Sequence, residues 1–312
     1  MTPPGRRPTL ADIARETGLS RAAVSYALRG LQVPVETQTR VREVADRLGY
    51  SANPIARALS SGRTDTIGVL CGSLDDSWQQ AVTAALVQAL PETGRQAVIM
   101  DAGSDPAVQL ALAERLVDTR ADAIVVMPLD PAAPEWSDLA ERATVVSIGD
   151  GLPTARAAAE IVYDNVAGVT DGLGRLAAAG HERVAVLSPI GVDTPDRPAE
   201  AVVARVGAEL SLLARVVQSP HELDAACAVV RAELATAEPP TGFLCLADSM
   251  AWGVYAAARE LGLTIPGDLS VIGYDDAPVS RLLVPPLTTY HWPMGRLVDA
   301  VTRTLERAID EG

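Results

Sequence analysis

The feature that most constrains this fold is an alternation of short apolar runs with helix-period segments, which starts at residue 66. The expected strands are residues 66–71, 97–101, 123–127, 145–148, 183–187, 242–246 and 269–274. The expected helices between them are residues 78–90, 108–117, 166–179, 223–234 and 250–261. Apolar strands that alternate with helices build a parallel sheet that is covered on both faces. The strands fall into two sets, which predicts an α/β unit of two lobes.

The first fifty residues follow another pattern, in which short amphipathic helices succeed one another. Thr9 is suited to cap a first helix that ends at Gly18, and Ser20 is suited to cap a second helix. A third helix is expected over residues 36–48. Two short helices joined by a glycine turn are typical of a helix-turn-helix. Spacing alone leaves open that these are three ordinary helices of a small bundle.

The charge of the chain is divided unequally along its length. The net charge is −14, which by itself argues against a nucleic-acid partner. Residues 1–63, however, hold ten arginines and five carboxylates, a net charge of +5. The remaining residues hold sixteen arginines and thirty-five carboxylates, a net charge of −19. This asymmetry indicates that the first sixty or so residues face a polyanion and that the rest does not.

A short helix-competent stretch follows the three expected helices. Asn53 is suited to cap it, Pro54 would take its first helical position, and residues 60–62 end it. A helix of this length is only marginally stable alone in water. We therefore expect the stretch to fold against a partner, which could be DNA or a second copy of the chain.

Three consecutive motifs in this part of the chain resemble the lactose-repressor (LacI/GalR) family. They read T-L-A-D-I-A-R-E-T-G-L-S-R-A-A-V-S-Y-A-L-R-G, then T-R-V-R-E-V-A-D-R-L-G-Y, then N-P-I-A-R-A-L. The resemblance implies an all-α helix-turn-helix headpiece at residues 1–50 and a hinge helix with a linker at residues 51–63. Residues 64–312 would form a ligand-sensing domain with the two α/β lobes of the periplasmic-binding-protein-like fold. The implied function is that of a transcriptional repressor, released from a palindromic operator by a small-molecule effector such as a sugar or a related metabolite.

The resemblance also implies which residues contact double-stranded operator DNA. They are Thr9, Ser20, Arg21, Ala22, Ser25, Tyr26, Arg29, Asn53, Ala56, Arg57 and Leu59. The helix after Ser20 would lie in the major groove with Arg21, Ala22 and Tyr26 toward the bases. Leu59 would enter the minor groove and open a central base step. Many family members have arginine at the position of Tyr26, so we expect a half-site that differs from the commonest ones.

The effector residues implied by the resemblance lie after the expected strands of the second unit. They are Trp78, Asp150, Arg197, Asp248 and Asp275. The chain departs from the family pattern where Ala247-Asp248 replaces Asn-Asp and where Asp150 comes one residue late. It also ends at Gly312, before the C-terminal strand that family members carry, so we expect part of one lobe to be completed in another way or to be absent.

Other classes of protein fit the sequence less well. A solute-binding protein shares the two-lobed fold but would need a signal peptide and would not carry a basic head. An α/β enzyme would need an acid-base or metal constellation, and the only paired carboxylates, at residues 75–76 and 275–276, have no ligand-spaced histidine. The glycine motif at residues 172–177 lies within a helical pattern, which denies it the geometry of a dinucleotide site. His181 follows a helix-ending glycine and is interpreted as structural. We therefore expect neither an enzyme nor a cofactor or metal.

The cysteines and the expected DNA contacts indicate the compartment and the assembly of the protein. Cys71, Cys227 and Cys245 lie in separate apolar stretches and indicate reduced thiols in a cytoplasmic protein. No apolar run is long enough for a membrane span. Two half-sites and two hinge helices require a homodimer. The sequence leaves open whether the effector releases or promotes DNA binding, because each needs only a difference in affinity for two lobe arrangements.

Overall fold

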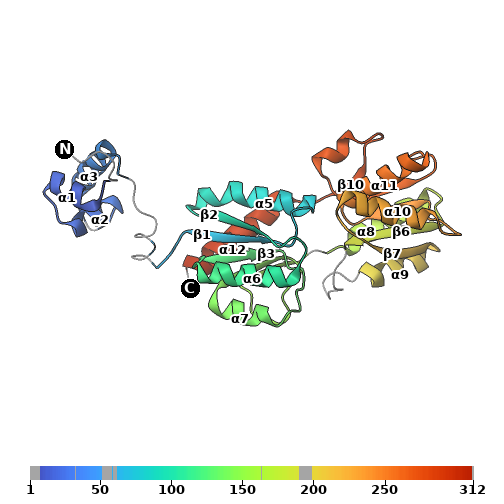
Figure 1. Ribbon diagram of the computed structural model, residues 1–312, viewed down its shortest axis with the longest axis horizontal. Helices are drawn as coiled ribbons and strands as arrows, with labels where there is room; N and C mark the ends of the chain where they lie inside the picture. Colours follow the sequence, from blue (N-terminus) through green and yellow to red (C-terminus); the bar gives the residue numbers. More distant parts are fainter. Residues whose placement is uncertain are drawn as a thin grey trace. The chain divides into compact units, whose positions relative to one another are not determined.

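The computed structural model describes residues 8–31, 33–50, 58, 62–162, 164–189 and 199–310. The chain divides into two compact units, Met1–Thr64 and Asp65–Gly312. Figure 1 shows the first unit as a group of helices and the second as two α/β lobes. No helix in the described part of the chain is long and apolar enough to cross a membrane.

Three helices form the first unit. They are α1 (Leu10–Thr17), α2 (Arg21–Leu28) and α3 (Val35–Leu48). The Asp12 carboxylate accepts hydrogen bonds from the Thr9 backbone N–H at 2.9 Å and from the Thr9 hydroxyl at 2.7 Å, which fixes the start of α1. Gly18 ends α1 with a φ of 70°, a left-handed conformation that glycine adopts without steric cost. Ile13, Val24 and Val41, one from each helix, are fully buried in the core that joins them.

The second unit contains two five-stranded sheets, and every strand pairing within them is parallel. The first sheet has the order β2-β1-β3-β4-β5 and the second has the order β10-β9-β8-β6-β7. The strands of the first sheet are β1 (Thr66–Cys71), β2 (Gln96–Asp101), β3 (Ala123–Val126), β4 (Thr144–Gly149) and β5 (Ala159–Val162). Those of the second are β6 (Arg183–Pro189), β7 (Leu213–Ser219), β8 (Gly242–Cys245), β9 (Ser270–Asp275) and β10 (Thr288–His291).

Helices cover both faces of each sheet. In the first lobe these are α5 (Ser77–Ala89), α6 (Pro106–Asp118), α7 (Glu135–Arg142) and α12 (Met294–Asp310), with the 3-10 turn η1 (Leu90–Thr93) after α5. In the second lobe they are α8 (Val166–Ala178), α9 (Ala199–Leu210), α10 (Leu223–Leu234) and α11 (Asp248–Leu261), with the 3-10 turn η2 (Pro278–Leu282) after β9. The core residues assign α5 and α12 to one face of the first sheet and α6 and α7 to the other. They assign α10 and α11 to one face of the second sheet and α8 and α9 to the other.

The chain passes between the lobes twice in the described segments. It leaves the first lobe after β5 and returns from β10 into α12. Val301 and Leu305 of α12 are fully buried with Ile67 and Val82 of the first lobe. The first lobe is therefore built from two separate parts of the sequence, and α12 lies beside its sheet in Figure 1 although it is the last helix of the chain.

Candidate DNA-reading surface and effector cavity

The exposed face of α2 carries the side chains that were expected to read DNA. Arg21, Ala22, Tyr26 and Arg29 are exposed, and Ser25 is half-buried between them. The other face of the helix packs inward through the fully buried Val24 and Ala27. The guanidinium carbon of Arg29 lies 5.3 Å from the centre of the Tyr26 ring, within the range of a cation–π contact. The contact holds the side chains of Tyr26 and Arg29, two of the residues expected to contact DNA, next to one another on this face.

Thr9 and Ser20 sit at the two helix starts of the headpiece. The Ser20 hydroxyl oxygen accepts a hydrogen bond from the Ala23 backbone N–H at 3.1 Å, and Ser20 is exposed. The half-buried Thr9 directs its hydroxyl to Asp12 of its own helix. The expected hinge residues lie outside the described residues. They are Asn53, Ala56, Arg57 and Leu59.

Two arginines of α3 bind the headpiece itself. The Arg40 guanidinium donates a hydrogen bond to the Thr17 carbonyl oxygen, and the Arg47 guanidinium pairs with the Glu16 carboxylate. Both contacts tie α3 to α1. Part of the positive charge that the sequence indicates therefore makes contacts within the unit. On the exposed face of α2 the positively charged side chains are those of Arg21 and Arg29.

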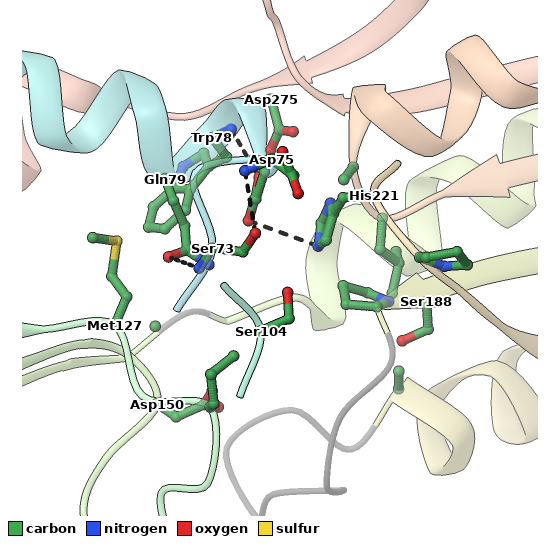
Figure 2. Close-up of a pocket in the computed structure, with 18 of the residues that line it drawn as sticks. Ser73, Asp75, Trp78, Gln79, Ser104, Met127, Asp150, Ser188, His221 and Asp275 are labelled. Carbon is green, nitrogen blue, oxygen red and sulfur yellow. Dashed lines mark hydrogen bonds and ion pairs between the residues drawn. The ribbon is translucent and has the colours of Figure 1, made fainter. Parts of the chain in front are cut away.

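A cavity of about 350 Å³ lies between the two lobes of the second unit. Its lining comes from the carboxyl ends of strands and the loops after them, including β1, β2, β3 and β4 in one lobe and β6, β7, β8 and β9 in the other. Ligands of open parallel sheets bind outside these strand ends. Trp78, Asp150 and Asp275, three of the five expected effector residues, line this cavity (Figure 2). Arg197 lies outside the described residues.

Asp275 is the cavity residue with the most unusual environment. Its backbone has a φ of 127°, which is rare for a residue with a side chain. Its carboxyl group accepts hydrogen bonds from the Asp248 backbone N–H at 3.2 Å and from the Trp292 side chain. Burial, and then the negative charge of Asp76, raise the pKa of Asp275 to about 9. At neutral pH the group is therefore a neutral acid that can donate a hydrogen bond to a ligand and accept another.

Asp248 does not occupy the position that the resemblance implied. It is fully buried and is absent from the residues that line the cavity. Its carboxylate accepts hydrogen bonds from the Ser280 hydroxyl at 2.7 Å, the Thr289 hydroxyl at 2.6 Å and the Ala277 backbone N–H at 2.9 Å. The expectation of an effector residue is corrected here to a structural one, because these bonds join the start of α11 to the loop after β9 and to β10.

The structure adds cavity residues that the sequence did not single out. His221 lines the cavity after β7, and its Nδ1 lies 3.0 Å from the Ser249 hydroxyl. Its Nε2 lies 3.7 Å from the carboxylate of Asp76, which belongs to the other lobe and is the N-cap of α5. Trp292, between β10 and α12, also lines the cavity. A strand signal at β7 would have placed His221 at a sheet end, but that strand was not expected.

Two features that resemble enzyme motifs have structural positions. Gly172 lies inside α8, and a Cβ on it would come within 2.8 Å of Leu244, so the glycine serves close packing of the helix on the sheet. His181 Nδ1 lies 2.8 Å from the Thr241 hydroxyl, and burial lowers the pKa of its imidazole. Among the described residues, no group of three histidine, cysteine or carboxylate side chains is placed to hold a metal ion.

A helix-turn-helix unit followed by a two-lobed α/β unit with a cavity between the lobes defines the class of DNA-binding regulators with a sensor domain. Residues 9–53 match the model of bacterial regulatory proteins of the lacI family, and residues 173–312 match the periplasmic binding protein-like domain.

Relatives over nearly the whole chain agree with this class. The chain is 30% identical to the HTH-type transcriptional regulator MalR of Streptomyces coelicolor, over 95% of this chain and 88% of that protein. It is 25% identical to the catabolite control protein A of Priestia megaterium, over 97% and 93% of the two chains. The crystal structure of a lac repressor dimer bound to operator and an anti-inducer superimposes with a TM-score of 0.83 at 23% identity, over 98% of this chain and 94% of that chain.

The chain belongs to the lacI family of bacterial regulatory proteins. It is a DNA-binding transcriptional regulator and not an enzyme. The expected fold class, an all-α headpiece with a two-lobed sensor domain, is confirmed.

Proposed function

We propose that this chain is a homodimeric repressor whose α2 helices read a near-palindromic operator and whose cavity binds a small-molecule effector. The observation that carries the proposal is the face of α2, where Arg21, Ala22, Tyr26 and Arg29 are exposed together in a unit of net positive charge. A helix of this kind in a helix-turn-helix enters the major groove. The domain limits 1–50, 51–63 and 64–312 belong to the same proposal, as does a place of action in the cytoplasm.

The expected contacts divide by what they would recognise. Arg21 and Tyr26 would face base edges, and arginine pairs well with the two acceptors of guanine. Ser20, Ser25 and Thr9 would lie near phosphates, which fix the position of the protein without reading sequence. Leu59 of a hinge helix would open the central base step, with Asn53, Ala56 and Arg57 beside it. A palindromic operator has two half-sites and is bound by two hinge helices, so the proposal requires two chains.

Exposed apolar side chains support the dimer. β2 is an edge strand of the first sheet, and its Val98 and Ile99 are exposed, as is Val87 of α5. In the second lobe Leu282 and Val284 are exposed to 79% and 91%. An edge strand offers unpaired backbone groups to another chain, and exposed apolar side chains can be covered in an interface. A second copy of the chain would cover them.

The cavity supports an effector that carries hydroxyl groups, such as a sugar or a related metabolite. Asp150 and Asp275 offer carboxyl groups to hydroxyls, and Trp78 and Trp292 offer apolar surface beside them. Arg197, also in the proposed set, would suit vicinal hydroxyls or a carboxylate. One neighbour of the same fold, the transcriptional regulator CelR, was solved with cellobiose, at a TM-score of 0.68 and 22% identity. That ligand belongs to that protein and indicates only where to begin a search.

Effector binding would draw the lobes together, shift the starts of the hinge helices and release the operator. The opposite sign, in which the effector promotes binding, remains a second hypothesis. It needs the same cavity but a higher affinity of the effector for the operator-bound arrangement.

The test begins with selection from a pool of random DNA duplexes, at a fixed salt concentration because phosphate contacts make affinity depend on salt. We expect recovery of a near-palindrome. A panel of neutral mono- and disaccharides is then added to the complex, with Asp275→Ala as the comparison. We expect one sugar to release the wild-type protein and not the variant. Recovery of no sequence by folded protein would reject the operator assignment, and an equal response of Asp275→Ala would reject the cavity.

A further inference from the structure

One histidine–carboxylate contact crosses the cavity from lobe to lobe. His221, which follows β7 in the second lobe, brings its Nε2 to 3.7 Å from Oδ2 of Asp76 in the first lobe. Figure 2 shows the His221 ring turned toward the loop that carries Ser73 and Asp75, with the contact drawn across the space between the lobes. The separation is longer than a hydrogen bond, so a small approach of the lobes would tighten it.

Each partner is held firmly within its own lobe. The Asp76 carboxylate caps α5 by accepting a hydrogen bond from the Trp78 backbone N–H at 2.8 Å, and Asp76 is only 6% exposed. The His221 ring is bound through Nδ1 to the hydroxyl of Ser249 on α11. Because neither side chain is free to follow the other, the distance between them reports the separation of the two lobes.

The charge of neighbouring Asp275 decides whether the two lobes repel one another at this contact. Asp275 lies on the same lobe as His221, and the charges of Asp76 and Asp275 influence one another. An ionised Asp275 would repel Asp76 and oppose lobe closure. Burial holds Asp275 in its neutral form, with its pKa raised to about 9. The contact of His221 with Asp76 therefore meets little opposition from a charge on Asp275.

We propose that Asp76 and His221 are positioning residues that favour the closed arrangement of the lobes before any effector binds. This inference goes beyond the proposed function, because it holds for any effector and for either sign of coupling. A partly buried histidine–carboxylate contact that tightens to a hydrogen bond on closure would shift the ratio of closed to open forms by about fivefold. Since the apparent affinity of a ligand falls with the fraction of competent protein, the pair would also raise the affinity of the cavity for its effector.

Two substitutions remove the pair and keep the local structure. Asp76→Asn removes the charge, and asparagine caps a helix as well as aspartate does. His221→Asn removes Nε2 and leaves an amide near Ser249. The lobe separation is measured by electron–electron double resonance in the full-length chain, with spin labels on Ala111→Cys of α6 and Ala208→Cys of α9, both exposed positions. Labelled chain is co-assembled with excess unlabelled chain so that distances within one chain dominate.

We expect each substitution to move the distance distribution toward longer separations, and the double variant to move it no further than either single one. Glu114→Gln is the matched control, because it breaks an ion pair with Arg142 that lies within the first lobe. That variant should leave the distribution unchanged. Tryptophan fluorescence melts identify any variant that is not folded, and Asp76→Ser is the replacement if Asp76→Asn fails this check. Unchanged separations in the folded variants, or shifts that add in the double variant, would overturn the proposal.

Discussion

The two units of this chain place their polar side chains in opposite ways. In the headpiece the proposed reading side chains lie within nine consecutive residues, 21–29, on the exposed face of one helix. In the sensor domain the cavity is lined from strand ends of both lobes that are spread over more than 200 residues. The charges differ as well, with +5 on residues 1–63 and −19 on the rest.

The difference shows what each unit must accomplish. A repeating polyanion can be met by side chains on one helix, because its charge is long-range and its geometry is regular. A small molecule offers few contacts, so the groups that hold it must converge from several directions around a concave site. The acidic sensor domain also disfavours contact with DNA through any surface other than the headpiece.

The largest effect that can test this division is the response to salt. Raising the salt concentration from about 50 to 200 mM should weaken operator binding by about a thousandfold, because arginines of the headpiece displace counterions from phosphates. Binding of a neutral sugar to the cavity should change by less than about twofold over the same range, since uncharged ligands release few ions. Fluorescence anisotropy with labelled operator and calorimetry with the sugar measure the two affinities. A steep salt dependence of sugar binding would contradict the proposal that only the headpiece binds its partner through charge.

Arg21→Ala should have the next largest effect. Loss of a bidentate contact with guanine costs about 1–3 kcal/mol and relaxes the base preference at one position of each half-site. Arg47→Ala is the control, because it removes the same charge from the headpiece but breaks an internal pair with Glu16. It should lower the melting temperature of the headpiece and leave the base preference as it was. Repeated selection from random duplexes measures the base preference of both variants. An unaltered preference in Arg21→Ala would remove this residue from the reading surface.

The division also explains which features the sequence could predict. The headpiece follows from local spacing, since Gly18 ends one helix and Ser20 starts the next. The central strands of both sheets were expected because they are apolar runs. The edge strands β5, β7 and β10 were missed because they are half-exposed and carry polar residues, such as Arg215 and Gln218 in β7.

The cavity shows the limit of reasoning from sequence position. Trp78 and Asp275 follow strands that were expected, and the structure places both at the cavity. Asp248 also follows an expected strand, but Ser280 and Thr289 bind its carboxylate and keep it out of the cavity. Those partners lie thirty or more residues away, so no local pattern could reveal them. His221 was missed because its strand was missed.

Leu59→Ala tests whether the proposed hinge contributes to operator binding and not to sugar binding, and its expected effect is smaller. Removing the side chain that opens the base step should weaken operator binding by about tenfold, or about 1.4 kcal/mol, because alanine cannot fill the opened step. Sugar binding to the cavity should stay the same, because the substitution lies outside the sensor domain. The two titrations of the salt experiment serve here again. Full operator affinity in the variant would remove Leu59 from the wedge position.

The last test leaves operator binding aside and concerns the internal electrostatics of the sensor domain. Burial raises the pKa of Asp275 from 3.8 to about 9, so the folded domain holds a proton that the unfolded chain releases above about pH 4. The unfolding free energy must therefore fall as the pH rises from about 4 toward 9, and Asp275→Asn removes this contribution while keeping the shape of the side chain. The variant should therefore be more stable than wild type by a margin that vanishes near pH 4 and grows by up to about 1.4 kcal/mol for each pH unit toward pH 8.

All four tryptophans of the chain lie in residues 65–312, so fluorescence melts at a series of pH values report on the sensor domain and not on the headpiece. Asp268→Asn is the comparison, because hydrogen bonds from Thr264 lower the pKa of this exposed carboxylate. Its contribution has the opposite sign, being present at neutral pH and lost as the pH falls through the lowered value. If Asp275→Asn and wild type kept a constant stability difference from pH 4 to 9, Asp275 would be ionised in the folded domain. Its charge would then repel Asp76 across the cavity, and the cavity would share the acidic character of the outer surface of the sensor domain.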